Sequence, residues 1–201
     1  MQLNNKSPMN GINSEEKLLT LLRASSINEL LERYALGERD FPGSKLNGIN
    51  LNNNNLRGTD FSRANFNQAQ LQGTDFSQAN LSDTNFKQAQ LSRANFNQAN
   101  LNSSYLVDAD LTNADLRDTV LRSADLRGAN LSNTNLSGAN LSLADLRGAN
   151  LNGANLTNVN LSNTFLSNAN LNGAYIIGAN LRYTDFNGAN ITNTRFENNI
   201  Y

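Results

Sequence analysis

The sequence predicts an all-β solenoid, and two observations on its repeats support that prediction. Every fifth position from Phe41 to Tyr201 is Leu, Phe, Ile or Tyr, without a break over 33 positions. In addition, the segment 124–131 recurs twenty residues later, residue for residue, at 144–151. A fixed period of this kind indicates a repeat architecture, which decides the fold before any single element is considered.

A period of five residues fits neither an α-helix nor a flat β-strand. Five helical steps turn through roughly 500°, so the leucines would not share one face. On a strand, an odd period places successive leucines on opposite sides. The backbone must therefore turn a corner every five residues, and the twenty-residue duplication predicts four corners per coil. Eleven of the thirteen glycines lie two residues after a repeating Leu, Phe or Ile, where a tight turn favours residues that tolerate positive φ.

The motif Ala-(Asn/Asp)-Leu-x-x resembles the pentapeptide-repeat family, over about four-fifths of the chain. That resemblance implies a right-handed quadrilateral β-helix. Twenty residues per coil predict about eight coils and a rod roughly 40 Å long, at ~4.8 Å per coil. The same register stacks Phe76 over Phe96 in the core. Because Leu and Phe fill the axis, no internal ligand cavity is expected.

The chain is expected to divide into three parts. Residues 1–13 are polar and are predicted to be flexible. Residues 14–40 are predicted to form a short α-helical N-terminal cap, and residues 41–201 the β-helix. A solenoid must cover the exposed end of its core, which favours a capping role for the helices. The alternative is that they form a partner-binding module.

Two helices are expected in the cap. Ser14 is suited to the N-cap of the first helix. Ser26 and Glu29 form a capping box for the second, which is predicted to end at Gly37. Position 39 is Arg, where later repeats carry Ala or Thr, so the first regular coil is expected to begin near Ser44.

The composition argues against catalysis and metal binding. The chain contains no Cys, His or Trp, so Ser-His and Cys-His couples and ordinary zinc sites are excluded. We therefore expect no enzyme activity, no cofactor and no metal. The first residues lead into no apolar run, so neither a secretory signal nor a membrane span is expected. These features together predict a cytoplasmic protein.

The charge of the repeat argues against nucleic-acid binding. Residues 41–201 carry eleven basic and eleven acidic residues, whereas a phosphate-binding face needs a net positive potential. Some members of the family resemble DNA and bind DNA gyrase. Such mimicry requires a strongly negative surface, whereas this repeat is neutral. Some gyrase-protecting members also carry loop insertions, and this repeat has no insertion from 41 to 201. A DNA-mimic inhibitor or protector of DNA gyrase is therefore the alternative function, behind a non-catalytic protein–protein interaction module.

Most outward positions of the repeat carry Asn, Ser, Thr or Gln, so the exceptions indicate a candidate protein-binding surface. Apolar and aromatic residues around a group of Asp and Arg are typical of interfaces. The alternative is a surface salt-bridge ladder with scattered apolar residues, which needs no functional explanation. The candidate residues are Tyr105, Val107, Val120, Arg122, Asp125, Arg127, Leu143, Asp145, Arg147 and Phe165.

The predicted partner is another protein, in a regulatory or scaffolding role. The segment 34–41 and the helices before it are similar to cyanobacterial pentapeptide-repeat proteins, one branch of which regulates heterocyst differentiation through protein binding. A second expected contact is a homodimer through the last coil, where Phe196, Ile200 and Tyr201 would leave apolar surface. A frayed, water-exposed last coil is the alternative to that dimer.

Overall fold

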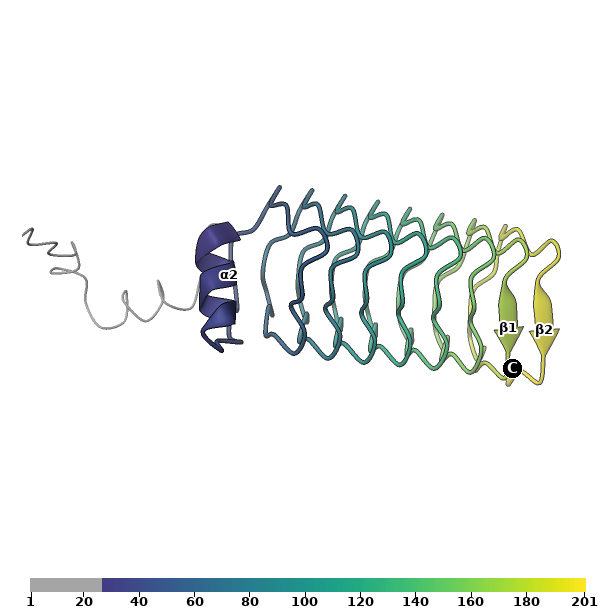
Figure 1. Ribbon diagram of the computed structural model, residues 1–201. Coiled ribbons are helices and arrows are strands. Elements are labelled where there is room, and N and C mark those ends of the chain that lie inside the picture. The colour runs from purple at the N-terminus through teal and green to yellow at the C-terminus, as the bar shows by residue number, and fades with distance from the viewer. Residues whose placement is uncertain (1–26) are drawn as a thin grey trace, which may run out of the picture.

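The structure is a computed structural model in which residues 27–201 are described. It shows one helix at the end of a rod of stacked coils (Figure 1). The expected flexible segment 1–13, the helix expected from Ser14 and the proposed N-cap Ser26 lie outside the described residues.

The helix α2 (Ile27–Ala35) packs its apolar side against the first coil of the rod. Leu30 is fully buried, and Ile27, Leu31 and Tyr34 contact the core. The helix ends in a Schellman motif. The N–H of Glu38 donates to the Arg33 carbonyl at 3.0 Å, and Gly37 has a positive φ of 94°. The sequence therefore predicted this C-terminal stop correctly.

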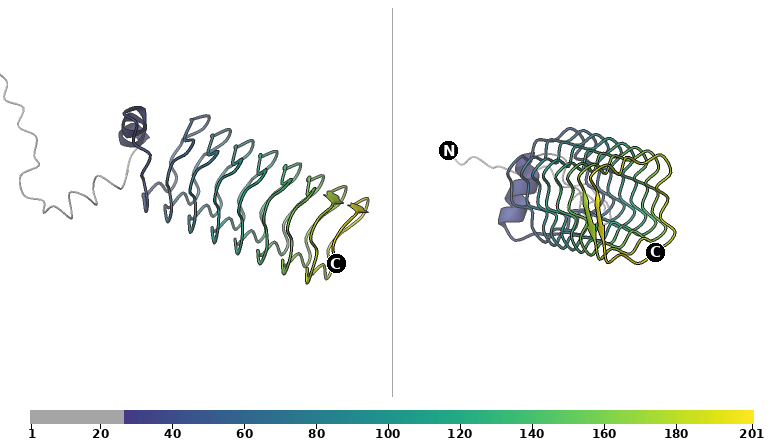
Figure 2. Two further views of the ribbon diagram at one scale, coloured as in Figure 1. Left: turned by 90° about the horizontal axis from the view of Figure 1, so that it is seen from below. Right: turned by 90° about the vertical axis from the view of Figure 1, so that its right-hand side faces the viewer.

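The coils pair in parallel with a register of twenty residues. Each coil has four sides, visible along the rod axis in Figure 2, and the bridges join residues into four outward columns that we number as faces. Each face is a column of residues spaced twenty apart. The columns run from 40 to 200 on face 1, from 45 to 185 on face 2, from 50 to 190 on face 3 and from 55 to 195 on face 4. In most pairings only one residue of each coil is bridged to the next coil, because a turn lies on either side of that residue. The two regular strands, β1 (Tyr175–Ile177) and β2 (Arg195–Glu197), pair in parallel on face 4.

A β-turn follows each central Leu or Phe and makes the corner. At most corners the N–H three residues on donates to the central carbonyl, as from Ala99 to Phe96 at 2.8 Å. The residue two places after the centre has positive φ throughout the rod, between 54° and 73°, as the third residue of a type II turn requires. Gly and Asn occupy many of these positions, in agreement with the expectation from sequence.

The core is a continuous stack of the central residues. Every one from Phe41 to Leu181 is at most 4% exposed. Phe76 stacks on Phe96 with ring centroids 5.5 Å apart, as predicted, and Phe66 stacks on Phe86 at 5.2 Å. Rings of neighbouring columns meet edge to face, an arrangement that aromatic quadrupoles favour.

Small residues two places before each central residue complete the packing. Most are Ala, and the Thr residues at these positions satisfy their hydroxyl groups on the backbone. Thr74 donates from Oγ1 to the Leu51 carbonyl of the preceding coil at 2.8 Å, and Thr134 donates to the Leu111 carbonyl at 3.0 Å. These bonds tie neighbouring coils together without placing an unpaired polar group in the core.

The two ends of the described rod differ. The expectation that the first coil begins near Ser44 was wrong by one turn: Asp40 already pairs with Asp60, and Phe41 is fully buried. The Arg33 guanidinium of α2 lies over the Phe41 ring at 4.9 Å, which supplies the contact that a preceding coil would otherwise make. In the last coil Ile191 is 50% exposed although it occupies a central position.

A charge placed on the axis should prevent folding. Leu131 is 1% exposed in the middle of the rod, and an unpaired carboxylate there would face a dry apolar column. We expect Leu131→Asp to lose the cooperative thermal transition measured by far-UV circular dichroism. The control is Asn133→Asp on the exposed corner of the same turn, which should fold like the wild type. A soluble, cooperatively melting Leu131→Asp protein would contradict the register.

Candidate protein-binding surface

Face 2 carries two large exposed aromatic residues among otherwise polar side chains. The Tyr105 and Phe165 side chains are 52% and 49% exposed. The ladder connects them through Asp125 and Asp145, each pair in parallel register. The column read from the sequence is therefore the column in the structure, and it places both aromatics on one side of the rod.

The two Asp residues between the aromatics each bind an Arg of their own coil. Arg127 donates from Nε to Oδ1 and from Nη2 to Oδ2 of Asp125, at 2.8 and 2.7 Å. Arg147 holds Asp145 in the same way, at 2.9 and 2.6 Å. This bidentate geometry is the strong form of the Arg–carboxylate pair. A longer contact of 3.7 Å links Arg127 Nε to Asp145 Oδ2 of the next coil.

These contacts set the charge states of the cluster. Burial raises the pKa of Asp145, but hydrogen bonds from the Arg147 side chain and backbone, with the charges of Arg147 and Arg127, outweigh it and lower the pKa below its ordinary value. The hydrogen bond and charge of Asp125 raise the pKa of Arg127. Asp145, Arg127 and Arg147 are therefore ionised at neutral pH, and the formal charges of the two Asp–Arg pairs sum to zero.

The Arg groups are only partly available to a partner. One edge of each guanidinium is occupied by its own Asp, although the Arg127 and Arg147 side chains remain 51% and 53% exposed. The pairing also follows from repeat position alone, because Arg117 binds Asp115 on face 4 at 2.6 Å with the same spacing. The Asp–Arg pair is thus a local motif of this repeat, and what distinguishes face 2 is that two such pairs stack between aromatics.

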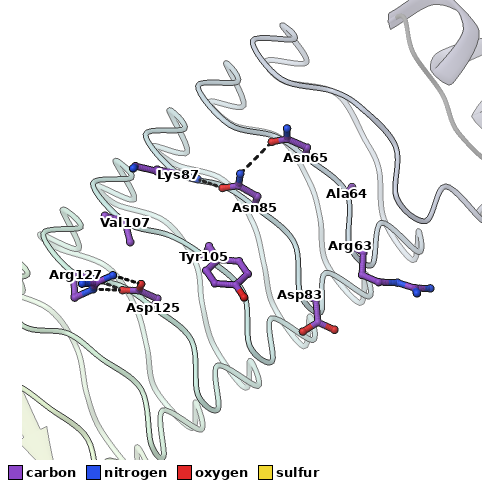
Figure 3. Close-up of a pocket in the computed structure, with 10 residues that line it drawn as sticks. All are labelled: Arg63, Ala64, Asn65, Asp83, Asn85, Lys87, Tyr105, Val107, Asp125 and Arg127. Carbon is purple, nitrogen blue, oxygen red and sulfur yellow. Dashed lines mark hydrogen bonds and ion pairs between the residues drawn. The ribbon is translucent and has the colours of Figure 1, made fainter.

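A shallow open groove of about 600 Å³ lies on face 2 at the Tyr105 end (Figure 3). Tyr105 follows Asn85 in the ladder, and Asn85 Nδ2 donates to Asn65 Oδ1 at 3.3 Å. Asn65 and Asn85 lie next to each other in the lining, while Arg63 and Asp83 lie along one edge. The groove is lined by Arg63, Ala64, Asn65, Asp83, Asn85, Lys87, Tyr105, Val107, Asp125 and Arg127.

The groove contains only part of the predicted site. Four predicted residues line it: Tyr105, Val107, Asp125 and Arg127. Asp145 and Phe165 lie in the next coils of face 2, outside the groove, and Leu143 and Arg147 lie at the two corners beside Asp145. Val120 belongs to face 1, and Arg122 to the corner between faces 1 and 2.

Sequence reasoning missed six of the groove residues, from Arg63 to Lys87. The signal was present, because counting back twenty and forty residues from Tyr105 reaches Asn85 and Asn65. A small amide side chain next to a large aromatic ring in the same column predicts a depression in the surface beside the ring. Across residues 27–201, no three His, Cys, Asp or Glu side chains are grouped so that they could hold a metal ion. The same part of the chain has no helix long and apolar enough to cross a membrane.

Comparison with known proteins gives one family and several similar structures. The family model described as pentapeptide repeats (8 copies) matches residues 44–83, 69–106, 79–118, 104–142, 124–163 and 154–198. The chain is 30% identical to HetL, a pentapeptide repeat protein involved in heterocyst differentiation regulation in the cyanobacterium Nostoc sp. The match covers 86% of this chain and 95% of HetL, with a TM-score of 0.58.

Two further structures are similar at lower TM-scores. A second pentapeptide repeat protein from Nostoc is 33% identical over 65% of this chain and 81% of its own, with a TM-score of 0.28. The plasmid-mediated fluoroquinolone resistance protein QnrB1 is 22% identical over 74% and 88%, with a TM-score of 0.45. No curated protein matched the chain.

The lowered pKa of Asp145 predicts a pH-dependent contribution to stability. Because its folded pKa lies below that of an unfolded Asp, about 3.9, the ionised group stabilises the fold above about pH 4, and this contribution is lost as the pH falls through the folded pKa. Asp145→Asn should therefore be less stable than the wild type at pH 7, by at most about 1 kcal/mol for an exposed pair.

Urea denaturation at pH 7, 4 and 3 would measure this difference, which should shrink toward low pH. Repeating the pH 7 measurement in 1 M salt provides the control, because screening should also reduce it. A difference that grows as the pH falls would contradict the assignment.

Proposed function

The chain belongs to the pentapeptide repeat family, and from this premise we propose that it is a cytoplasmic, non-catalytic protein that binds another protein through face 2. Family membership also confirms the fold class predicted from the sequence, an all-β right-handed quadrilateral β-helix with a helix at its N-terminal end. Proteins of this kind are generally structural or interaction modules.

The composition of face 2 carries the proposal. Tyr105 and Phe165 lie three ladder steps apart, about 14 Å at ~4.8 Å per step, with two stacked Asp–Arg pairs between them. Exposed aromatics and Arg are the side chains most enriched at the energetic centres of interfaces. Face 4 carries a single outward aromatic, Tyr175, and Arg195 lies over its ring at 5.3 Å. Face 3 carries none.

The dimensions of face 2 suit a protein partner. From Asn65 to Asp185 the column makes six ladder steps, about 29 Å at ~4.8 Å each. With its two corner columns, a face of this length can contribute much of the ~800 Å² per partner that a standard interface buries. The groove beside Tyr105 is open and shallow, which suits a protruding side chain or segment better than an enclosed small molecule.

The role we propose is regulatory or scaffolding, and the setting is suggested by similarity. HetL takes part in the regulation of heterocyst differentiation and is similar to this chain over most of both sequences. We propose that the present protein acts in cyanobacterial cell differentiation by binding a protein partner. The homodimer through Phe196, Ile200 and Tyr201 is a separate proposal, favoured by the 50% and 78% exposure of the last two side chains.

The arginines of the stacked pairs should contribute to partner binding. Replacing both Arg127 and Arg147 with Ala removes the exposed guanidinium edges, and we expect affinity for the partner to fall about tenfold or more. The melting temperature should change by no more than about 2 °C, because exposed ion pairs contribute little to stability. Affinity capture from cells of the source organism, with wild-type and variant protein as parallel baits, would identify and quantify the partner.

Face 3 supplies the control for this experiment. Changing Asn130 and Asn150 to Asp alters two stacked outward positions on the adjoining face, and the partner should still be captured at the wild-type level. If both double variants lose the partner equally, or if the arginine variant retains it, face 2 does not bind the partner.

A gyrase assay distinguishes the alternative function. DNA mimicry depends on a strongly negative surface, whereas the repeat body is neutral and Asp125 and Asp145 are paired with Arg. We therefore expect no inhibition of DNA gyrase supercoiling at stoichiometric protein. Inhibition under those conditions would replace the proposed function with the DNA-mimic alternative.

A further inference from the structure

Two corner positions of the rod hold a Leu and a Tyr in a backbone conformation that disfavours bulky side chains. Leu143 has φ 63° and Tyr183 has φ 59°. All other positive-φ residues of the coils are Gly, Asn, Gln, Asp, Ser or Arg. The left-handed region brings Cβ close to the backbone, so a bulky residue there strains the fold unless other contacts compensate.

Burial does not compensate for the strain at these two positions. The Leu143 side chain is 42% exposed and that of Tyr183 is 86% exposed. An Asn at either position would relieve the backbone at no cost to the core, as Asn163 does between them in the same corner column. The folding of the rod therefore does not account for these side chains.

Leu143 and Tyr183 flank Phe165, one of the two exposed aromatic residues of face 2. Leu143 N–H donates to the Ser162 carbonyl at 3.0 Å, and Asn163 N–H donates to the Arg182 carbonyl at 2.9 Å, so the corner column steps from 143 through 163 to 183. Phe165 lies in the middle of these three coils, on the adjoining face. We call Leu143, Phe165 and Tyr183 the apolar strip. Exposed apolar groups that gather on neighbouring coils mark interaction sites.

A carboxylate without an ion pair adjoins the strip. Asp185 follows Phe165 in the face 2 ladder. The position two residues on, where Asp125 and Asp145 have their Arg, is Asn187, whose backbone N–H donates to Asp185 Oδ1 at 2.9 Å. Within residues 27–201 no cation lies within ion-pair distance of Asp185. The strip thus combines apolar surface with one negative charge that nothing in the rod neutralises.

We propose that the apolar strip receives an aliphatic or aromatic side chain of the partner protein, and that a Lys or Arg next to that side chain pairs with Asp185. This inference rests on the proposed function of face 2 and specifies the chemistry of the partner. It also explains why strained residues occupy the corner: their exposed surface contributes to binding and not to folding.

The test uses a random 12-residue peptide library displayed on phage and selected against the immobilised full-length protein. Selected peptides should carry an apolar residue adjacent to Lys or Arg. Their synthetic forms should bind in fluorescence anisotropy, and the triple variant Leu143→Asn, Phe165→Asn, Tyr183→Asn should weaken that binding by about tenfold or more. Asp185→Asn alone should weaken it by a smaller factor and reduce its dependence on salt.

Thermal melting separates a binding role from a structural one. The melting temperature of the triple variant should stay level or rise, by up to about 4 °C, because two strained turns are relieved. The matched control is Arg93→Asn, which relieves the same backbone conformation (φ 59°) at another corner and should leave peptide affinity unchanged. A clear fall in melting temperature for the triple variant would assign the strip to folding and overturn the proposal.

Other outcomes are equally decisive. Peptides that bind the triple variant as tightly as the wild type, or that carry acidic residues in place of basic ones, would overturn this inference. If those peptides still lose affinity for the Arg127→Ala, Arg147→Ala protein, the proposed function of face 2 stands and only the inference about the apolar strip fails. If no selected peptide depends on any face 2 residue, both fail. Self-association of the wild type that the triple variant abolishes, measured by sedimentation, would make a second copy the occupant and overturn the proposal.

Discussion

The backbone hydrogen bond that closes most of the β-turns, within a turn geometry common to every corner, underlies the rest of this structure. It joins the carbonyl of a central Leu or Phe to the N–H three residues on, and it recurs along the rod with the same positive φ in the turn. Because each side of the coil uses five residues, residues twenty apart always meet. The core, the ladders and the four faces all follow from this constant spacing of five residues per side. One inserted residue would shift every later side chain by one position.

This geometry separates the residues that fold the rod from those that remain free to vary. The central residues and the small residues before them are buried, so each contributes to the core at about 25 cal/mol per Å² of apolar surface. The outward residues contribute little to the core. Exposed aromatic or strained residues at outward positions therefore stand out against the Asn and Ser background, and Phe165 and Tyr183 are the clearest examples.

Electrostatics on this rod is local. Asp115, Asp125 and Asp145 each accept hydrogen bonds from the Arg two residues later, so the paired charges cancel within one coil. A long-range field that attracts nucleic acid or imitates it cannot arise from such pairs. Specificity must instead come from contacts at short range, between side chains that project from neighbouring coils.

Much of the fold follows from the sequence alone, because the period never slips. Counting in steps of twenty predicts that Phe76 stacks on Phe96 and that one column aligns Tyr105, Asp125, Asp145 and Phe165, and the structure shows both. A constant period makes spatial neighbours a matter of arithmetic, so the core, the turns and the columns of each face are sequence properties. The α2 C-terminus was predictable for a similar reason, since its Gly acts through local backbone geometry.

The remaining features depend on the direction and size of side chains, which the period does not specify. Only the tertiary structure shows that Arg127 and Arg147 turn toward the Asp of their own coils and that Asn85 lines the groove beside Tyr105. The same holds for the contact of Arg33 in α2 with the Phe41 ring. The strain at Leu143 and Tyr183 is also a tertiary result. Their sequence neighbours allow other conformations, and it is the closed coil that holds both residues at positive φ.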